Sequence, residues 1–296
     1  MNLLARNRTI TFPRRPLVMG ILNLGAESFS GDSVTHLDLA LRRVRQMIAE
    51  GADIIDVGAE SASTGRPPMS EAEEIAYLLP FVRQFVAEQA DFPRPADPAQ
   101  LFPPLLSINT WRTAVVEAVL PAGGDLLNDL SALATADANA RLCAATGAAL
   151  LLMHNEGEPK VWHPYHAYPD VMGALEAFFE EKIAQAEAAG VPRDGLVLDP
   201  GIGFSKLRDD NLRIYRNLER LHRFGRPILL PVSRKMVIGE VLGLPPAERD
   251  AGTVACIVSG LRRGAQLFRV HNIRAAVQTI RTAGAVIAAG ESDIAG

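Results

Sequence analysis

The chain has few cysteines, and this excludes a disulfide-stabilised scaffold and a cysteine-rich zinc site. Its 296 residues include two cysteines, Cys143 and Cys256, which lie far apart and lack the spacing of metal ligands. Disulfide-stapled domains and cysteine-rich zinc sites need more cysteines at closer spacing. We therefore expect both thiols to serve as buried packing residues.

Neither a strong net charge nor a long apolar run is present. The 30 lysines and arginines against 34 aspartates and glutamates give a formal net charge of −4, whereas general nucleic-acid binders show a basic excess. No apolar run approaches the roughly 18–20 uncharged residues that span a bilayer. Arg6 and Arg8 interrupt the first residues, where a signal peptide would have its apolar core. The sequence therefore predicts no nucleic-acid partner, no membrane partner and a cytoplasmic location.

What the chain does have is an alternation of short apolar segments and longer amphipathic segments. The apolar segments predict strands at Leu17–Asn23, Ile54–Val57, Leu105–Asn109, Leu126–Asn128, Ala149–Met153, Leu196–Asp199, Pro227–Val232 and Gln266–Val270. Helical patterns occupy residues 37–51, 70–89, 110–123, 168–190 and 210–225. Three of them end in Gly51, Gly190 and Gly225, as is common just past a helix C-terminus. The alternation indicates βα units around a parallel sheet.

These elements predict an α/β fold with a closed (β/α)8 TIM barrel that forms a single domain over residues 1–296. A doubly wound open sheet is the alternative. Residues 1–16 are expected to form an N-terminal extension or a hairpin over the bottom of the barrel. The proline-rich residues 91–105 are expected to be a long connection before the third strand.

Almost every predicted strand ends in a polar side chain. In strand order these are Asn23, Asp56, Asn109, Asn128, His154, Asp199, the Ser233–Lys235 segment, and Arg269 with His271. A single such residue would be interpreted as a cap or turn residue. Eight strand ends meet at one rim of a barrel, however, and catalytic groups of this fold lie there. The set therefore predicts an active site at the rim.

The polar set divides into two kinds of chemistry. A flat heterocycle could be bound by the donors and acceptors of Asn109, Asn128, Asp199 and Lys235. A carboxylate such as Asp199 can accept two N–H bonds from a 2-aminopyrimidinone edge. A cationic pocket for phosphate groups could be formed by Asn23, Arg269 and His271. A heterocycle that carries a diphosphate would satisfy both halves.

The segment DPGIGFSK, residues 199–206, predicts a tight turn after the sixth strand. Such a turn could aim Asp199 inward and let a ligand reach Phe204, although a plain strand-to-helix connection is the alternative. His154 has no second histidine close by on its strand, so a structural role is favoured over metal binding. Asp53 precedes the second strand and is interpreted as a structural residue.

Eight stretches of the sequence resemble the dihydropteroate synthase family. They are VMGILNLGAESFSGDS, GADIIDVGAES, LLSINTW, GGDLLNDLSA, LLLMHNEGEP, LVLDPGIGFSK, PVSRKMVIGEVLG and FRVHNIRAAV, in the family's order. The resemblance implies a pterin pocket inside a (β/α)8 barrel, a Mg²⁺-assisted diphosphate site at its rim, and a homodimer. It also implies a transferase of folate biosynthesis that joins 6-hydroxymethyl-7,8-dihydropterin diphosphate to p-aminobenzoate and releases diphosphate.

The resemblance assigns roles to individual residues. Asn128, Asp199 and Lys235 match the pterin-binding set, and Asn109 stands where the family normally has Asp. Arg269 and His271 match the anion pocket, and Asn23 matches the metal ligand of the first loop. Phe204 and Lys235 would flank the arylamine, and Arg66 could be the anion-binding arginine of the second loop. The residues expected to act in catalysis are Asn109, Lys235, Arg269 and His271.

The match departs from the family pattern at four places. The first loop reads NLGAESFS where the family has N-x-T-P-D-S-F-S, and the second reads GAESASTGRPP where the family has G-E-S-T-R-P-G. Asn109 lacks the carboxylate charge, and Met236 stands where the family usually has Ser. These departures leave four hypotheses. They are a divergent synthase for p-aminobenzoate, a transferase for another arylamine, a pterin-binding protein without synthase activity, and a methyltransferase that uses reduced folate.

Overall fold

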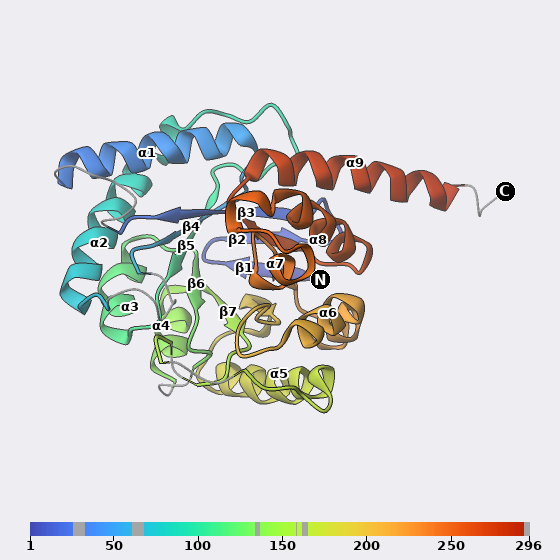
Figure 1. Ribbon diagram of the computed structural model, residues 1–296. Coiled ribbons are helices and arrows are strands. Elements are labelled where there is room, and N and C mark those ends of the chain that lie inside the picture. Colours follow the sequence, from blue (N-terminus) through green and yellow to red (C-terminus); the bar gives the residue numbers. More distant parts are fainter. Residues whose placement is uncertain (26–32, 61–67, 134–136, 158, 162–164, 293–296) are drawn as a thin grey trace.

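Eight of the described strands form one barrel enclosed by helices (Figure 1). The computed structural model describes residues 1–25, 33–60, 68–133, 137–157, 159–161 and 165–292. The barrel strands are β3 (Leu17–Asn23), β4 (Ile54–Gly58), β5 (Leu105–Asn109), β6 (Leu126–Asp129), β7 (Ala149–Met153), β8 (Leu196–Asp199), β9 (Leu229–Pro231) and β10 (Leu267–Val270). They pair in parallel in the order β8-β7-β6-β5-β4-β3-β10-β9.

The two ends of this sheet meet and close it. An isolated parallel bridge joins Leu198 of β8 to Ile228, just before β9, and the Leu198 N–H donates to the Pro227 carbonyl at 2.9 Å. This closure confirms the predicted barrel and rules out the open sheet. β9 is shorter than the predicted Pro227–Val232 strand because Pro227 and Pro231 have no N–H to give to a ladder.

Helices cover the outside of the barrel, as Figure 1 shows. They are α1 (Ser33–Glu50), α2 (Glu71–Glu88), α3 (Thr113–Val119), α4 (Ala138–Thr146), α5 (Val171–Ala188), α6 (Arg208–Arg216), α7 (Met236–Leu242), α8 (Asp250–Arg262) and α9 (Ile273–Ser292). Short 3-10 turns are η1 (Gln89–Asp91), η2 (Leu120–Ala122), η3 (Arg193–Gly195), η4 (Leu218–Phe224) and η5 (Pro246–Glu248). The helix predicted over 210–225 is divided, because α6 ends at Arg216 and the chain continues as η4. No described helix is long and apolar enough to cross a membrane.

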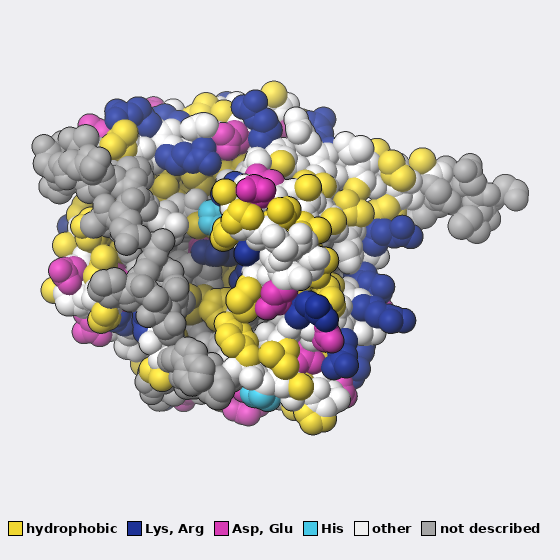
Figure 2. Space-filling view, viewed as in Figure 1, with side chains coloured by type: hydrophobic (Ala, Val, Ile, Leu, Met, Phe, Trp, Pro, Cys, Tyr) yellow, Lys and Arg dark blue, Asp and Glu magenta, His cyan; other side chains and the backbone are white. Residues whose placement is uncertain are grey.

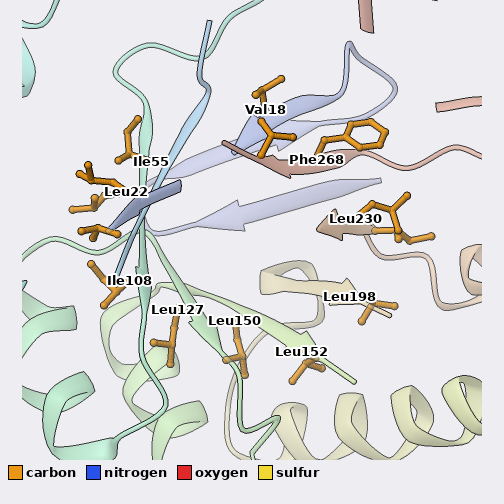
Figure 3. Close-up of a cluster of buried hydrophobic side chains, with 14 of the residues drawn as sticks. Val18, Leu22, Ile55, Ile108, Leu127, Leu150, Leu152, Leu198, Leu230 and Phe268 are labelled. Carbon is orange, nitrogen blue, oxygen red and sulfur yellow. The ribbon is translucent and has the colours of Figure 1, made fainter. Parts of the chain in front are cut away.

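Alternate side chains of each strand point to opposite sides of the barrel wall. One set packs outward against the helices and includes Val18, Ile108, Leu150 and Phe268 (Figure 3). The other set fills the interior with residues such as Leu17, Ile54, Leu105, Leu126 and Leu267. The barrel interior is therefore a packed core, and the rim at the C-terminal ends of the strands is where active sites of this fold lie.

A hairpin closes the lower end, as predicted. Strands β1 (Asn2–Ala5) and β2 (Arg8–Thr11) pair antiparallel, and their buried side chains Leu3 and Ile10 join the interior cluster. Asp53 ties this end together, because its carboxylate accepts from the Arg15 guanidinium at 2.9 and 3.0 Å and from the Val18 N–H at 2.8 Å. The structural interpretation of Asp53 is confirmed.

Candidate active site

Asp56 is the centre of a buried hydrogen-bond network at the upper rim. It lies on β4 with 1% of its surface exposed. Its carboxylate accepts from Ser107 Oγ at 2.6 Å, Asn109 Nδ2 at 3.2 Å and Asn128 Nδ2 at 3.2 Å. The Arg269 Nε donates to it at 2.7 Å. One carboxylate thus holds the side chains of three other strands, β5, β6 and β10, in a fixed arrangement.

The β5 side chains face Asp56 because of the register of the barrel. Asp56 of β4 is directly paired with Ser107 of β5, and Asn109 is directly paired with Asn128 of β6. Asn109 gives its amide N–H to Asp56, while its own Oδ1 is buried and has no hydrogen-bond partner among the described residues. Since a buried acceptor without a donor is costly, Oδ1 is suited to accept an N–H from a bound ligand.

Asp199 stands at the end of β8 and begins the tight turn that follows. It is 3% exposed, and burial raises its pKa to about 6, although the Gly201 N–H, which donates at 2.7 Å, and the nearby Lys235 act in the opposite direction. Desolvation lowers the pKa of Lys235 to about 8, and its ammonium lies 4.8 Å from the centre of the Phe204 ring. At neutral pH a carboxylate, an ammonium and an aromatic face therefore line one side of the site.

The predicted anion pocket contains one cation and one neutral ring. Arg269 is held by Asp56, while His271 Nδ1 lies 2.8 Å from Ser233 Oγ. Desolvation of the ring, together with the nearby Arg269, Arg234 and Lys235, lowers the pKa of His271 to about 4. The imidazole is thus neutral at pH 7. It can still donate or accept one hydrogen bond.

A second charged cluster lies beside the β4 end of the rim. The Arg112 guanidinium pairs with the carboxylates of Glu60 and Glu74, the latter at 2.5 Å, and Lys160 Nζ is 3.3 Å from Glu60. Glu60 also accepts the Met69 N–H at 3.1 Å. The two ends of the second loop, residues 60 and 69, are therefore fastened together and to the loops that follow β5 and β7.

Figure 2 shows basic side chains and a histidine recessed near the centre of one face of the molecule, with hydrophobic side chains around them. This arrangement, a polar network with an unpaired acceptor below a cationic rim, suits a flat heterocycle that carries an anion. Among the described residues, no group of three or more histidine, cysteine or acidic side chains could hold a metal ion by itself.

Comparisons with known proteins agree with this geometry. The family model for pterin binding enzymes matches residues 19–271. The dihydropteroate synthase of Escherichia coli strain K12 is 36% identical over 279 residues, which cover 94% of this chain and 94% of that protein. This chain belongs to the dihydropteroate synthase family of pterin-binding enzymes.

Solved synthases have the same fold. The Xanthomonas albilineans dihydropteroate synthase with 4-aminobenzoic acid matches with a TM-score of 0.84 and 34% identity, covering 97% of this chain and 98% of that one. A Yersinia pestis synthase with a pterine-sulfa conjugate matches with a TM-score of 0.81 and 34% identity, covering 97% of this chain and all of that one. The resemblance inferred from the sequence motifs is thus confirmed along most of the chain.

The structure places most of the residues that the synthase resemblance singled out on one rim. Asn109, Asn128 and Arg269 are joined through Asp56, and Asp199, Phe204 and Lys235 lie together across the barrel mouth. Asn23 is exposed at the end of β3. Arg66 and most of the altered residues of the first two loops lie outside the described residues, whereas Gly25 and Ala59 are described.

Three synthase-site features escaped the sequence analysis. Asp56 was noted as a strand end but not as the centre of the network, and Ser107 was not noted. Lys206 closes the DPGIGFSK motif and is fully buried. The sequence did contain a signal for the first two, since Asp56 interrupts the apolar residues of β4, and Ser107 lies two residues before Asn109 on the same face of β5.

Proposed function

We propose that this chain catalyses the dihydropteroate synthase reaction. It would join 6-hydroxymethyl-7,8-dihydropterin diphosphate to 4-aminobenzoate and release diphosphate. The observation that carries the proposal is the Asp56 network, which connects the heterocycle-binding amides of Asn109 and Asn128 to the Arg269 guanidinium. A single ligand with a flat head and an anionic tail would use both parts at once.

The heterocycle would lie between Asp199 and the two asparagines. The Asp199 carboxylate would accept N–H bonds from the 2-amino edge, and the unpaired Asn109 Oδ1 would accept another N–H. Lys235 would donate to the ring carbonyl, because its ammonium is charged below its pKa of about 8. These contacts fix the plane of the ring and the direction of its methylene substituent.

The diphosphate would lie above, against the cationic rim. A guanidinium has five N–H donors, and Arg269 gives the Nε–H to Asp56. The terminal N–H groups would bind phosphate oxygens with the Ser233–His271 pair alongside. Asn23, exposed at the end of β3, would hold Mg²⁺ through its amide oxygen. Since Mg²⁺ commonly takes one or two protein ligands and substrate phosphates, the lack of a described acidic cage is compatible with this role. Bound Mg²⁺ would neutralise charge on the departing diphosphate.

The reaction would proceed by ionisation at the pterin methylene group. The C–O bond to the diphosphate breaks with its electron pair on oxygen, and positive charge spreads into the pterin ring. The buried Asp56 carboxylate would lie near the ring and help to stabilise that charge, so that the neighbouring strand supplies the carboxylate that Asn109 lacks. The arylamine nitrogen then attacks the methylene carbon and loses a proton.

The acceptor would lie against Phe204 and the Lys235 stem. Their separation of 4.8 Å, ring centre to ammonium, makes a wall against which an aromatic amine can stack. Met236 follows Lys235 at the start of α7, is 42% exposed and offers no hydroxyl to a carboxylate. This position favours a second candidate, in which another arylamine replaces 4-aminobenzoate.

Calorimetry with Mg²⁺ would test the binding part of the proposal. The pterin diphosphate should bind more tightly than the bare hydroxymethyl pterin, because the rim contributes contacts to the anion. Equal affinities would favour a pterin-binding protein without transferase activity. Diphosphate release would then be measured with and without 4-aminobenzoate, and with a ribosylated aniline. Release with the second amine alone would identify a different acceptor, and no release with either would reject the synthase reaction.

We also propose that two copies of the chain associate through α8 and α9. An apolar groove between these helices is lined by Val254, Val258, Ala283, Val286 and Ile287. α9 projects beyond the body of the barrel and carries hydrophobic side chains along its length (Figures 1 and 2). The same groove on a second copy would cover this surface. Sedimentation should show a dimer that Val286→Glu dissociates, while the control Val161→Glu, at another exposed valine, leaves it intact.

A further inference from the structure

The turn after β8 carries one residue proposed to bind the heterocycle and one proposed to bind the arylamine. Asp199 opens the turn, and Phe204 lies five residues later. Between and just after them the backbone takes left-handed conformations at Gly201 (φ 67°), Gly203 (φ 80°) and Ser205 (φ 51°). Ser205 has a side chain and pays a steric cost for this conformation. Something in the structure must therefore hold the turn in its observed shape.

Lys206 is placed to do so. Its side chain is completely buried, and its Nζ lies inside the turn rather than at the surface. The three N–H groups of the ammonium have the carbonyls of Gly201 at 3.0 Å, Phe204 at 2.9 Å and His154 at 3.4 Å among their acceptors. It also lies 2.9 Å from His154 Nδ1. One side chain thus connects two positions of its own turn to the loop after β7.

The partner ring is suited to accept one of the three N–H groups of the ammonium. Burial and the adjacent Lys206 lower the pKa of His154 to about 3, so the imidazole is neutral and Nδ1 can accept. The two loops contact each other elsewhere as well, because Ser205 Oγ donates to Asn155 at 3.2 Å. They approach so closely that a Cβ at Gly201 would lie 1.9 Å from the His154 carbonyl oxygen. The predicted structural role of His154 is consistent with these contacts.

The chemistry of the side chain is also informative. The chain has four lysines, at positions 160, 182, 206 and 235, and its other basic side chains apart from histidine are arginines. An ammonium is a compact charge that can direct donors at several converging carbonyls, whereas a guanidinium is planar and larger. A cavity closed by three carbonyls and a ring nitrogen suits the ammonium.

We propose that Lys206 is a positioning residue, whose ammonium fixes Asp199 and Phe204 in the arrangement that holds the heterocycle and the arylamine next to each other. This inference rests on the proposed function and extends it to a residue that contacts neither substrate. It predicts that loss of the ammonium weakens the binding of both substrates together, although each is bound by a different residue of the turn.

The charge state of Lys206 gives the proposal a pH signature. Burial lowers its pKa to about 7, while Asp199, Glu156 and Asp210 raise it and Lys235 lowers it. His154 is the other titratable group against it and stays neutral. The ammonium should therefore hold the turn below about pH 7 and lose this ability above it. Lys235 deprotonates later, near its own pKa of about 8.

The test compares Lys206→Met with Lys206→Arg, and uses Lys182→Met on α5 as the control. Calorimetry would measure the affinity for the pterin diphosphate and, with pyrophosphate and pterin present, for 4-aminobenzoate. Lys206→Met should weaken both by roughly tenfold to a hundredfold, as expected for lost charged hydrogen bonds. Lys206→Arg should recover part of this loss because it keeps the charge, and Lys182→Met should change neither affinity.

The pH profile separates positioning from a general loss of stability. In the wild type the affinity for the pterin diphosphate should fall above about pH 7, and in Lys206→Met that limb should move toward pH 8. If Lys206→Met does not fold, His154→Leu removes one acceptor and should weaken both ligands by a few-fold. A lower melting temperature with unchanged affinities, or an effect on one ligand alone, would overturn the proposal. The binding measurements test the role of Lys206 even if the wild type releases no diphosphate. A failure of this proposal can therefore be distinguished from a failure of the proposed function.

Discussion

Arg269→Ala should lower the stability of the barrel and weaken the binding of both the heterocycle and the diphosphate. The guanidinium is the one positively charged donor to Asp56 among the described residues, and the Asp56 side chain is completely buried while that of Arg269 is 21% exposed. Truncation leaves the carboxylate with the neutral donors Ser107, Asn109 and Asn128. The variant therefore retains a buried negative charge without its counter-ion.

The expected cost follows from this environment. Removing one partner of a buried ion pair destabilises proteins by about 3–5 kcal/mol. Three hydrogen-bond donors remain, and water can reach the position of the partly exposed Arg269. We therefore expect the free energy of unfolding to fall by about 3 kcal/mol, at the lower end of that range.

Urea unfolding at pH 7 would measure this loss, with Arg220→Ala as the matched control. Arg220 pairs with Glu176 at 2.8 Å on the surface, and exposed pairs contribute little to stability. Calorimetry on the same variants would compare bare pterin with the pterin diphosphate. Both should bind Arg269→Ala more weakly, because Asp56 also orients Asn109 and Asn128 beneath the heterocycle.

Two results would contradict this reasoning. One is a loss of diphosphate affinity with full affinity for bare pterin, since Arg269 would then act as an anion clamp independent of Asp56. The other is an unfolding free energy equal to that of Arg220→Ala, which would mean that the ion pair contributes nothing to the fold.

Three further predictions follow from the same site. Asn109→Asp would place a second carboxylate about 3.2 Å from Asp56, and two charges at that distance repel by about 5 kcal/mol at an effective dielectric constant near 20. The pKa of the new carboxyl should therefore rise in the folded protein. Urea unfolding should show the free energy of unfolding falling as pH increases from 5 to 8. Pterin affinity measured by calorimetry should increase with pH through about 6, where Asp199 loses its proton, and Asp199→Asn should abolish that dependence. Phe204→Ala should weaken 4-aminobenzoate binding by about tenfold, as expected for a lost stacking contact of 1–2 kcal/mol, and leave pterin affinity unchanged.

The sequence was sufficient to predict the barrel because its strands are short apolar runs bounded by polar residues. All eight strands appear in the structure, along with the hairpin formed by β1 and β2. The boundaries were less predictable where local chemistry intervened. The prolines at 227 and 231 shorten β9, and the helix expected over 210–225 tightens into a 3-10 turn after Arg216.

The site was predictable as a set of strand ends but not as a network. Asp56 and Arg269 are 213 residues apart in the chain, and no local pattern indicates that one would neutralise the other. The low pKa of His271 likewise depends on burial of the ring and on nearby cations, among them Arg234 and Lys235 from the loop after β9. Lys206 was hidden for a different reason, because lysine is rarely buried and its partners are backbone carbonyls that a sequence does not distinguish.

The pairing between neighbouring barrel strands is weakest between β8 and β9, the two strands that lead to Asp199 and Lys235. Neighbouring strands elsewhere share ladders of three to five residue pairs, whereas β8 and β9 are joined by the single bridge from Leu198 to Ile228. A heterocycle bound by both Asp199 and Lys235 would connect β8 and β9 at the upper rim. The bound substrate would then strengthen the contact between the two strands. Its binding should slow hydrogen exchange at the Leu198 amide.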